Sequence, residues 1–175
     1  LDAGADVMAR AKDGATPLHR AAGLGARGAG QALIDADAEL MAGDEDGSIP
    51  LAWAARSGNP ANIQALLDAG ADVMARDGYG STPLHSAAAS RGKPASIQAL
   101  LAAGADVMAR AGDGSTPLHF AAGFGTPANI QALLDAGADA KAKNEEGITP
   151  WDLAQENEKL KGTKGYWALN DAQYN

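Results

Sequence analysis

The sequence predicts an all-α repeat solenoid, on the evidence of a spaced proline motif, recurring helix sequences and glycine-bounded connections between them. The motif Thr-Pro-Leu-His, or a variant of it, occurs five times along the chain. The motif prolines lie 33, 33, 34 and 33 residues apart, at Pro17, Pro50, Pro83, Pro117 and Pro150. Self-similarity at a fixed period of this length is the signature of a repeat architecture.

Each repeat opens with the signals of a helix start. Threonine before proline, as in Thr82-Pro83, supplies an N-cap residue and then a proline at the first helical position, where its missing N–H costs nothing. The helix that follows, residues 83–88, is rich in alanine, which lets a neighbouring helix approach closely. Glycines are expected to end the first helices and prolines to begin the second ones, at Gly58 and Pro60, Gly92 and Pro94, and Gly125 and Pro127.

The second helix of each repeat carries a leucine pair. Leu66-Leu67 recurs at residues 100–101 and 133–134, and Gly70 is expected to end the helix in the left-handed conformation that glycine tolerates. Residues 71–82 then form an extended excursion with a turn at its tip. One such unit cannot bury its own leucine pair, so neighbouring units must stack.

These motifs together resemble the ankyrin repeat. Thr-Pro-Leu-His with Ala-Ala two residues on, a Leu-Leu second helix and Gly-Ala-Asp cover residues 1 to about 156. The resemblance implies antiparallel helix pairs stacked side by side, with β-hairpin loops projecting from one edge. We expect repeats at 11–43, 44–76, 77–110 and 111–143, after the remnant of a repeat at 1–10 and before a capping repeat at 144–175. Residues 1–10 are identical to residues 67–76, which indicates a longer parent protein, and residues 161–172 are similar to the endings of bacterial ankyrin proteins.

The departures from the family pattern lead to further expectations. Gly28-Ala29-Gly30 predicts that the second helix of the first repeat is the loosest, and Ile49 with Ala52 predicts a weaker cap in the second. Tyr166 and Trp167 take the leucine-pair positions of the last repeat, which predicts that they are buried in the cap. Methionine replaces the asparagine common in the family loops, so we expect a polar contact to the backbone to be lost and the thioethers to pack together, at Met8, Met41, Met74 and Met108.

Composition limits the classes of partner. Fourteen basic against 22 acidic residues give a net charge of −8, with no positive stripe for nucleic acid or an anionic membrane surface. The chain has no cysteine, which excludes disulfides and thiolate metal sites. No apolar run is long enough for a membrane span, and no leader is present in the sequence. We expect a cytoplasmic location, with the periplasm or secretion as alternatives if a leader was removed.

No residue pattern indicates catalysis. His19, His85 and His119 share one repeat position, so they lie on separate helices about 8–10 Å apart or more and cannot bind one metal ion. The family resemblance implies instead that this histidine hydrogen-bonds the backbone across the turn. The acidic runs at 44–46 and 145–146 are expected at solvated loop tips, without the burial that acid catalysis needs. We therefore expect no enzyme activity, no cofactor and no metal site.

The resemblance implies a non-catalytic module for protein–protein interaction, whose partner lies along the concave face and touches loop tips and inner helices. Large aromatic side chains at such positions suit binding hot spots, although partial burial against the next helix is the alternative interpretation of Trp53 and Phe120. A structural spacer, or a self-association module that uses the exposed N-terminal repeat face of an otherwise monomeric chain, is the alternative function. The candidate binding residues are Arg20, Glu45, Asp46, Trp53, Arg56, Tyr79, Asp113, Phe120, Phe124, Glu145 and Glu146.

Overall fold

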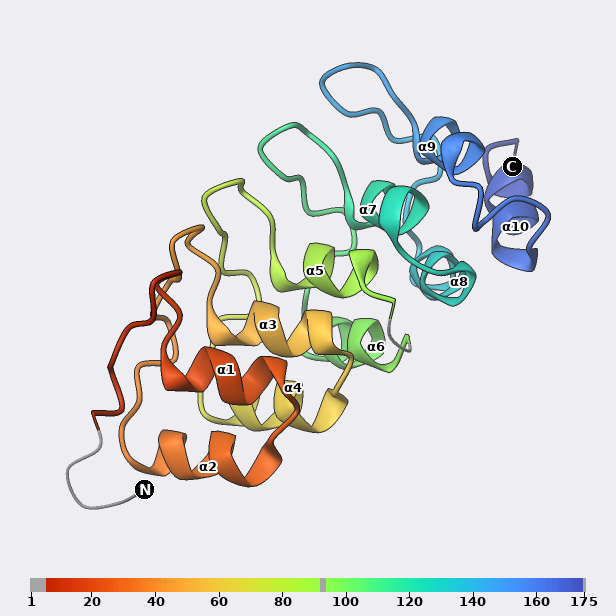
Figure 1. The fold of residues 1–175 in the computed structure, drawn as a ribbon. Coiled ribbons are helices and arrows are strands. Elements are labelled where there is room, and N and C mark those ends of the chain that lie inside the picture. Colours follow the sequence, from red (N-terminus) through yellow and green to blue (C-terminus); the bar gives the residue numbers. More distant parts are fainter. Residues whose placement is uncertain (1–5, 92–93, 175) are drawn as a thin grey trace.

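The computed structural model describes residues 6–91 and 94–174, and there it contains ten helices in five pairs (Figure 1). The first helices of the pairs are α1 (Pro17–Gly23), α3 (Pro50–Ser57), α5 (Pro83–Ala89), α7 (Pro117–Phe124) and α9 (Pro150–Glu156). The second helices are α2 (Arg27–Asp35), α4 (Pro60–Asp68), α6 (Ala95–Ala102), α8 (Pro127–Asp135) and α10 (Lys164–Ala172). Gly92 and residues 1–5 of the expected N-terminal remnant lie outside the described residues.

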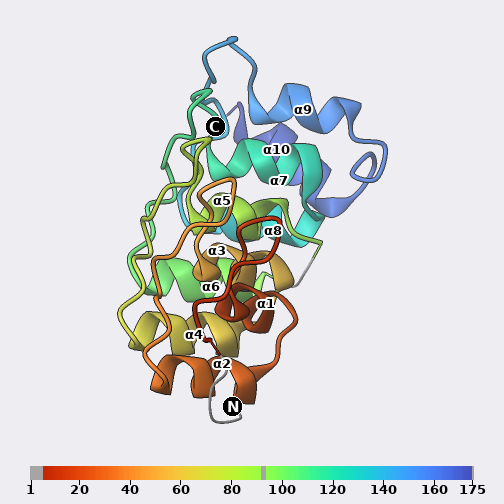
Figure 2. The same ribbon diagram turned by 60° about the vertical axis from the view of Figure 1, so that its left-hand side comes forward.

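The pairs stack in chain order into an elongated array, which confirms the all-α repeat solenoid. Each first helix packs against the first helix of the next pair, and the second helices form a parallel row behind them (Figures 1 and 2). Long loops connect the pairs and project from one edge of the array (Figure 1). Within the described residues these loops contain no assigned strand, so turns and loop-to-loop hydrogen bonds hold them.

Threonine and histidine together cap three of the first helices, α1, α5 and α7. The backbone N–H of Thr82 donates to Nδ1 of His85 over 3.1 Å, and the threonine hydroxyl lies 3.0 Å from the same nitrogen. Thr16 with His19 and Thr116 with His119 repeat this arrangement. The cap of each of these three helices therefore depends on the histidine side chain as well as on the threonine, whereas α3, with Ile49 as its N-cap residue, has no side-chain cap bond, as its weaker cap predicts.

The core runs through the array without interruption. Small alanines of the first helices, such as Ala88, pack beside fully buried leucines and isoleucines, such as Leu84, Ile97 and Leu100. Because alanine leaves little space between backbones, successive first helices approach closely and the leucine pairs of the second helices close the other side. The stacking therefore buries the first leucine of each pair but leaves the second half-buried, in Leu66-Leu67, Leu100-Leu101 and Leu133-Leu134.

The first repeat has the weakest second helix by local structure. Gly30 occupies the position of Ile63, and a Cβ added to it would meet no atom within 4 Å outside its own helix. Ala26, the N-cap residue of α2, makes no side-chain cap bond. Glycine within a helix and the lack of a cap each cost about 1 kcal/mol, so we still expect α2 to be the least stable helix.

The capping repeat differs from the prediction at Trp167, whose expected burial is wrong. Its side chain is 54 % exposed, whereas Leu169 and Leu160 are fully buried. Because α10 begins at Lys164, Gly165 and Leu169 share its inner face, one turn apart, and Trp167 between them points outward. A Cβ on Gly165 would come within 2.6 Å of Pro127 Cα, so no larger residue could replace it without a shift.

The methionine row also differs from the prediction, because the polar contact to the backbone is retained. Each of the four sulfur atoms accepts a hydrogen bond from a backbone N–H of the following loop, over 3.3–3.5 Å. The thioether sulfur is a weak hydrogen-bond acceptor, and here it makes a polar contact to the backbone at the position where asparagine is common in the family. The loss of a polar contact that the sequence indicates is therefore wrong.

Candidate functional site

Loop tips and first helices enclose a groove, the combination of elements expected for the concave face. It consists of four hollows of about 800, 700, 360 and 200 Å³, and Arg56 lines each of them. The largest hollow lies between the central loop tips and α5 and α7, and Tyr79, Ser86, Asp113 and Phe120 line it. We call the four hollows together the groove.

The loop tips that form one wall of the groove are held rigidly. Oδ1 of Asp77 accepts hydrogen bonds from the N–H groups of Tyr79 and Ser81 over 2.9 and 2.8 Å. Gly80 has φ +73°, and a Cβ there would lie 2.8 Å from the nitrogen of Gly112, so both the backbone and the space require glycine. This turn closes without strain and leaves the ring of Tyr79 at the tip.

Neighbouring tips are joined by backbone hydrogen bonds. Gly78 N–H donates to the carbonyl of Asp46 and Gly112 N–H to the carbonyl of Tyr79, each over 2.7 Å. Glu45 and Glu145 donate in the same way to Asp13 and Asp113, over 3.0 and 2.9 Å. The tips thus form a continuous ladder, and their side chains project from a common edge.

Tyr79 is the most prominent aromatic residue of the tips. Its side chain is 67 % exposed, and its hydroxyl donates to Oδ1 of Asp46 over 3.2 Å. The negative charge of Asp46, together with this hydrogen bond, raises the pKa of Tyr79 above its ordinary value. The ring is therefore held over the groove by a contact between two repeats while one face stays available.

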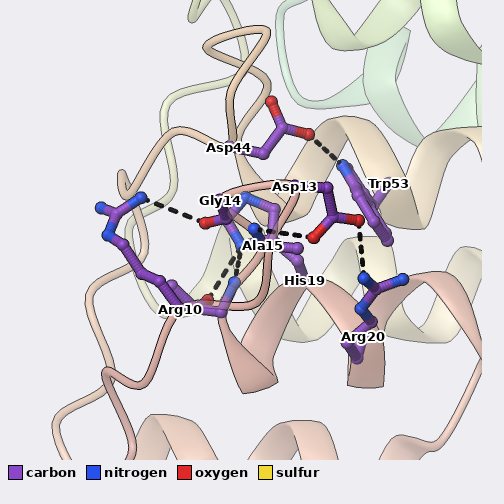
Figure 3. A network of polar contacts seen from close by, with 9 residues as sticks. Arg10, Asp13, Gly14, Ala15, His19, Arg20, Asp44 and Trp53 are labelled. Carbon is purple, nitrogen blue, oxygen red and sulfur yellow. Dashed lines mark hydrogen bonds and ion pairs between the residues drawn. The ribbon is translucent and has the colours of Figure 1, made fainter.

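Trp53 is fixed from both sides at the end of the groove nearer the first repeat (Figure 3). Its Nε1–H donates to Oδ2 of Asp44 over 2.8 Å, and its ring packs edge-on against His19 at 5.5 Å between centroids. The Arg20 guanidinium lies 5.2 Å from the centroid of the ring and pairs with Asp13 over 2.6 Å. Trp53 is thus half-buried against the preceding helix, α1, where its ring packs on His19 and Arg20.

Phe120 repeats the edge-on packing against histidine two repeats further along the array. It is half-buried, with its ring edge-on to His85 at 4.9 Å and to Phe124 at 6.5 Å. Phe124, at the end of α7, is 68 % exposed and lines the 700 Å³ hollow. The groove thus has aromatic walls at Trp53 and Phe120 and exposed rings at Tyr79 and Phe124.

Charge is divided between the two sides of the groove. Carboxylates lie at the tips, where Asp46, Asp113 and Glu145 line the largest hollow and Glu45 the smallest. Arg56, Arg91 and Lys159 line the 700 Å³ hollow at the ends of the first helices. Arg56 makes no hydrogen bond or ion pair with any residue that the structure describes.

The structure brings the candidate residues together in the groove, with one exception. Glu146 lies at a loop tip but lines none of the four hollows. Arg20 lines the 360 Å³ hollow beside Leu24, which is 82 % exposed. Two cations of the groove, Arg91 and Lys159, are absent from the sequence-based set. The one-residue insertion at 90–93 was the available signal for Arg91, and Lys159 lies in the cap, outside the repeat register.

The histidines have a structural role and lie apart from one another. Nε2 of His19 is 2.9 Å from the carbonyl oxygen of Ser48, and His85 and His119 reach Ser115 and Ile148 over 3.1 and 3.0 Å. Because Nδ1 accepts from the threonine N–H, the proton of the neutral ring belongs on Nε2. Burial lowers the pKa of all three below the ordinary value of 6.5, so each ring is neutral and joins its repeat to the next.

The described part of the chain lacks two other kinds of feature. There, no group of three or more histidine and carboxylate side chains is placed to hold a metal ion. Among the same residues, no helix is long and apolar enough to cross a membrane.

Comparison with known families agrees with the fold. The family model for ankyrin repeats (3 copies) matches residues 1–77 and 44–111, and that for ankyrin repeats (many copies) matches residues 100–154. No curated protein matches the chain. Ankyrin repeats are in general non-enzymatic modules for protein–protein interaction. The matches cover far more than half of the sequence, and the chain therefore belongs to the ankyrin-repeat family.

Proposed function

We propose that this chain is a non-catalytic module that binds a protein segment along the groove. The observation that carries this proposal is the 800 Å³ hollow, lined by exposed Tyr79 and half-buried Phe120 together with carboxylates and Arg56. Aromatic side chains beside charged groups in a concave surface are the typical composition of a binding hot spot.

The rigidity of the groove supports binding as well. Binding costs about 0.5–1.5 kcal/mol for each flexible side chain that it immobilises. Tyr79 is held in advance by its hydrogen bond to Asp46, and Trp53 by its bond to Asp44. The ladder between the tips fixes the backbone under them. Most of the ordering that a partner would otherwise impose is thus already present in the free protein.

The division of charge specifies the partner further. A segment lying across the groove would meet Asp46, Asp113 and Glu145 on the tip side, and Arg56 and Lys159 on the other. We infer a partner with basic side chains facing the tips and acidic ones facing the helix ends. Such complementarity sets orientation and association rate more than affinity. The acidic tips disfavour nucleic acid and anionic membranes, and a cytoplasmic location remains part of this proposal.

Self-association is the second candidate function, and one observation favours it. Leu24 is 82 % exposed at the end of α1, beside the hollow formed with Trp53. An exposed leucine next to an aromatic wall could contact a second copy of the chain. Light scattering over a range of concentrations distinguishes the two functions, because the binding module stays monomeric and the self-association module does not.

Site-specific cross-linking tests the proposed function. A photo-reactive residue at position 86, which lines two of the hollows, is compared with one at position 98, exposed on α6 away from the groove. In cells that produce the protein, position 86 should form a cross-linked adduct that position 98 does not, and Tyr79→Ala should reduce its yield. Adducts at position 98 alone would refute the assignment of the groove.

A further inference from the structure

The four methionines of the chain occupy the same place in four successive loops. Each sulfur accepts a hydrogen bond from the backbone of the next loop, so every one of these bonds joins two repeats. The distances from nitrogen to Sδ are 3.3 Å for Glu39 and Met8, 3.5 Å for Asp72 and Met41, 3.4 Å for Asp106 and Met74, and 3.3 Å for Asp139 and Met108. The sequence contains no other methionine. We call these four residues the methionine series.

The sulfur contacts belong to a longer chain of hydrogen bonds. Oδ1 of Asp72 accepts from the N–H of Met74, and Oδ1 of Asp106 accepts from the N–H of Met108, each over 2.8 Å. Each aspartate thus donates to the sulfur of the previous loop and accepts from the methionine of its own loop. The chain of bonds runs from Met41 to Lys141.

The distribution of methionine follows the distribution of donors. In the loop of the fourth repeat, which no further loop of this kind follows among the described residues, the same position holds Lys141. A methionine sulfur is therefore present at this position wherever a following loop can donate a hydrogen bond to it. Since the thioether is the acceptor in all four places, one kind of atom makes this contact between loops along the array, in addition to the hydrogen bonds between the tips.

Solvent reaches the side chains of the methionine series. Met41 is 43 % exposed, and Met8, Met74 and Met108 are half-buried. None of the four hollows of the groove is lined by a methionine. A change at the sulfurs would therefore act on the contacts between loops and would not directly touch the lining of the groove. Exposed thioethers are oxidised to sulfoxides by peroxides.

We propose that the methionine series is a site of reversible oxidation that loosens the stacking of the loops. The sulfur lone pair attacks one oxygen of hydrogen peroxide, a sulfur–oxygen bond forms, the oxygen–oxygen bond breaks, and water leaves after proton transfer. The thioether loses two electrons and the peroxide gains them. The product is polar and chiral, in place of a flexible apolar side chain.

Geometry gives the consequence of this step. The sulfoxide sulfur carries a partial positive charge, so an N–H that pointed at its lone pair now meets a like charge. The new oxygen cannot lie between sulfur and nitrogen, because they are only 3.3–3.5 Å apart. Either the N–H turns to water or the side chain moves away, and both break this contact between neighbouring loops while the hydrogen bonds between the tips remain. This inference does not rest on the proposed binding function.

Residue-resolved amide hydrogen exchange of the protein, before and after hydrogen peroxide, tests the proposal. Oxidation should speed exchange roughly two- to tenfold at the amides of Glu39, Asp72, Asp106 and Asp139, the effect of losing one hydrogen bond. The amides of Gly78 and Gly112, in the same loops but bonded from tip to tip, serve as controls and should change little. Treatment with methionine sulfoxide reductase should restore the original rates.

The variant Met41→Leu keeps an apolar side chain of similar size without an acceptor or an oxidisable atom. In it, the Asp72 amide should exchange faster before oxidation and not respond to peroxide, while the other three amides still respond. Unchanged rates at all four amides, with mass spectrometry showing oxygen on the methionines, would overturn the proposal. Methionines that resist peroxide under conditions that consume free methionine would overturn it as well.

Discussion

Replacing His85 by alanine should weaken the junction between the third and fourth repeats. The ring is fully buried, its Nδ1 accepts from the N–H of Thr82 and its Nε2–H donates to the carbonyl of Ser115. Leaving the buried Thr82 N–H without a partner costs about 1–3 kcal/mol, and losing the bond to Ser115 costs about 0.5–1.5 kcal/mol. The Ser115 carbonyl still accepts from Ala111, so it is not left unsatisfied. With the cavity of the missing ring, we expect a loss of about 3–5 kcal/mol.

Asp152 provides a matched control, because it occupies the histidine position in the last repeat. Its side chain accepts from the N–H and the hydroxyl of Thr149 over 2.8 and 2.7 Å, but among the described residues it makes no hydrogen bond to another repeat. Asp152→Ala therefore removes a helix cap but no contact between repeats, and it should cost about 0.5–2 kcal/mol of stability. Urea denaturation measures both variants, and native-state hydrogen exchange locates the weakened junction. A His85→Ala variant no less stable than Asp152→Ala would refute the role of histidine as a link between repeats.

Three further predictions follow from the same contacts. Stability should fall as pH drops below about 6.5, because burial lowers the pKa of the three histidines and the unfolded chain takes up protons first. The free energy of unfolding should decrease by at most about 1.4 kcal/mol per pH unit for each histidine. Urea midpoints that do not change between pH 7 and pH 5 would contradict this prediction. Ser96→Asn should stabilise the protein by about 1 kcal/mol. The buried Ser96 hydroxyl has no hydrogen-bond partner, whereas Asn62 and Asn129 at the same repeat position donate to carbonyls of the preceding repeat. A lower urea midpoint would show that the site cannot hold the amide. Trp167→Ala should cost less than about 1 kcal/mol of stability and Leu169→Ala about 2–5 kcal/mol, because Trp167 is exposed and Leu169 is fully buried. A melting temperature lowered more by Trp167→Ala than by Leu169→Ala would contradict the arrangement of the cap.

Much of the fold could be predicted because local signals and the repeat period agree. Pro17, Pro83 and Pro117 begin helices where the threonine–proline pattern places them, and Gly70 has the expected positive φ of 99°. The leucine pair was informative because only stacking can bury it. These features depend on residues close in the chain, which a sequence shows directly.

The remaining features depend on contacts between repeats. The repeat register assigns Trp167 to a leucine position, but the start of α10 rotates that position outward. The reach of a methionine sulfur to the next backbone, and the packing of Trp53 on His19, depend on the spacing between loops and helices. Arg91 joins the groove through an insertion that interrupts the register. A period identifies equivalent positions, but it does not measure the distances between them.

The affinity of Tyr79→Ala for the partner captured by cross-linking tests the central claim most directly. Tyr79 is exposed, and its one side-chain bond is to Asp46, so its loss should leave the melting temperature nearly unchanged. If the groove binds the partner, isothermal titration should show an affinity at least about fivefold lower, which corresponds to about 1 kcal/mol. Gln98→Ala, on the opposite face, should bind like the parent protein. An affinity lost with Gln98→Ala and retained with Tyr79→Ala would contradict binding along the groove.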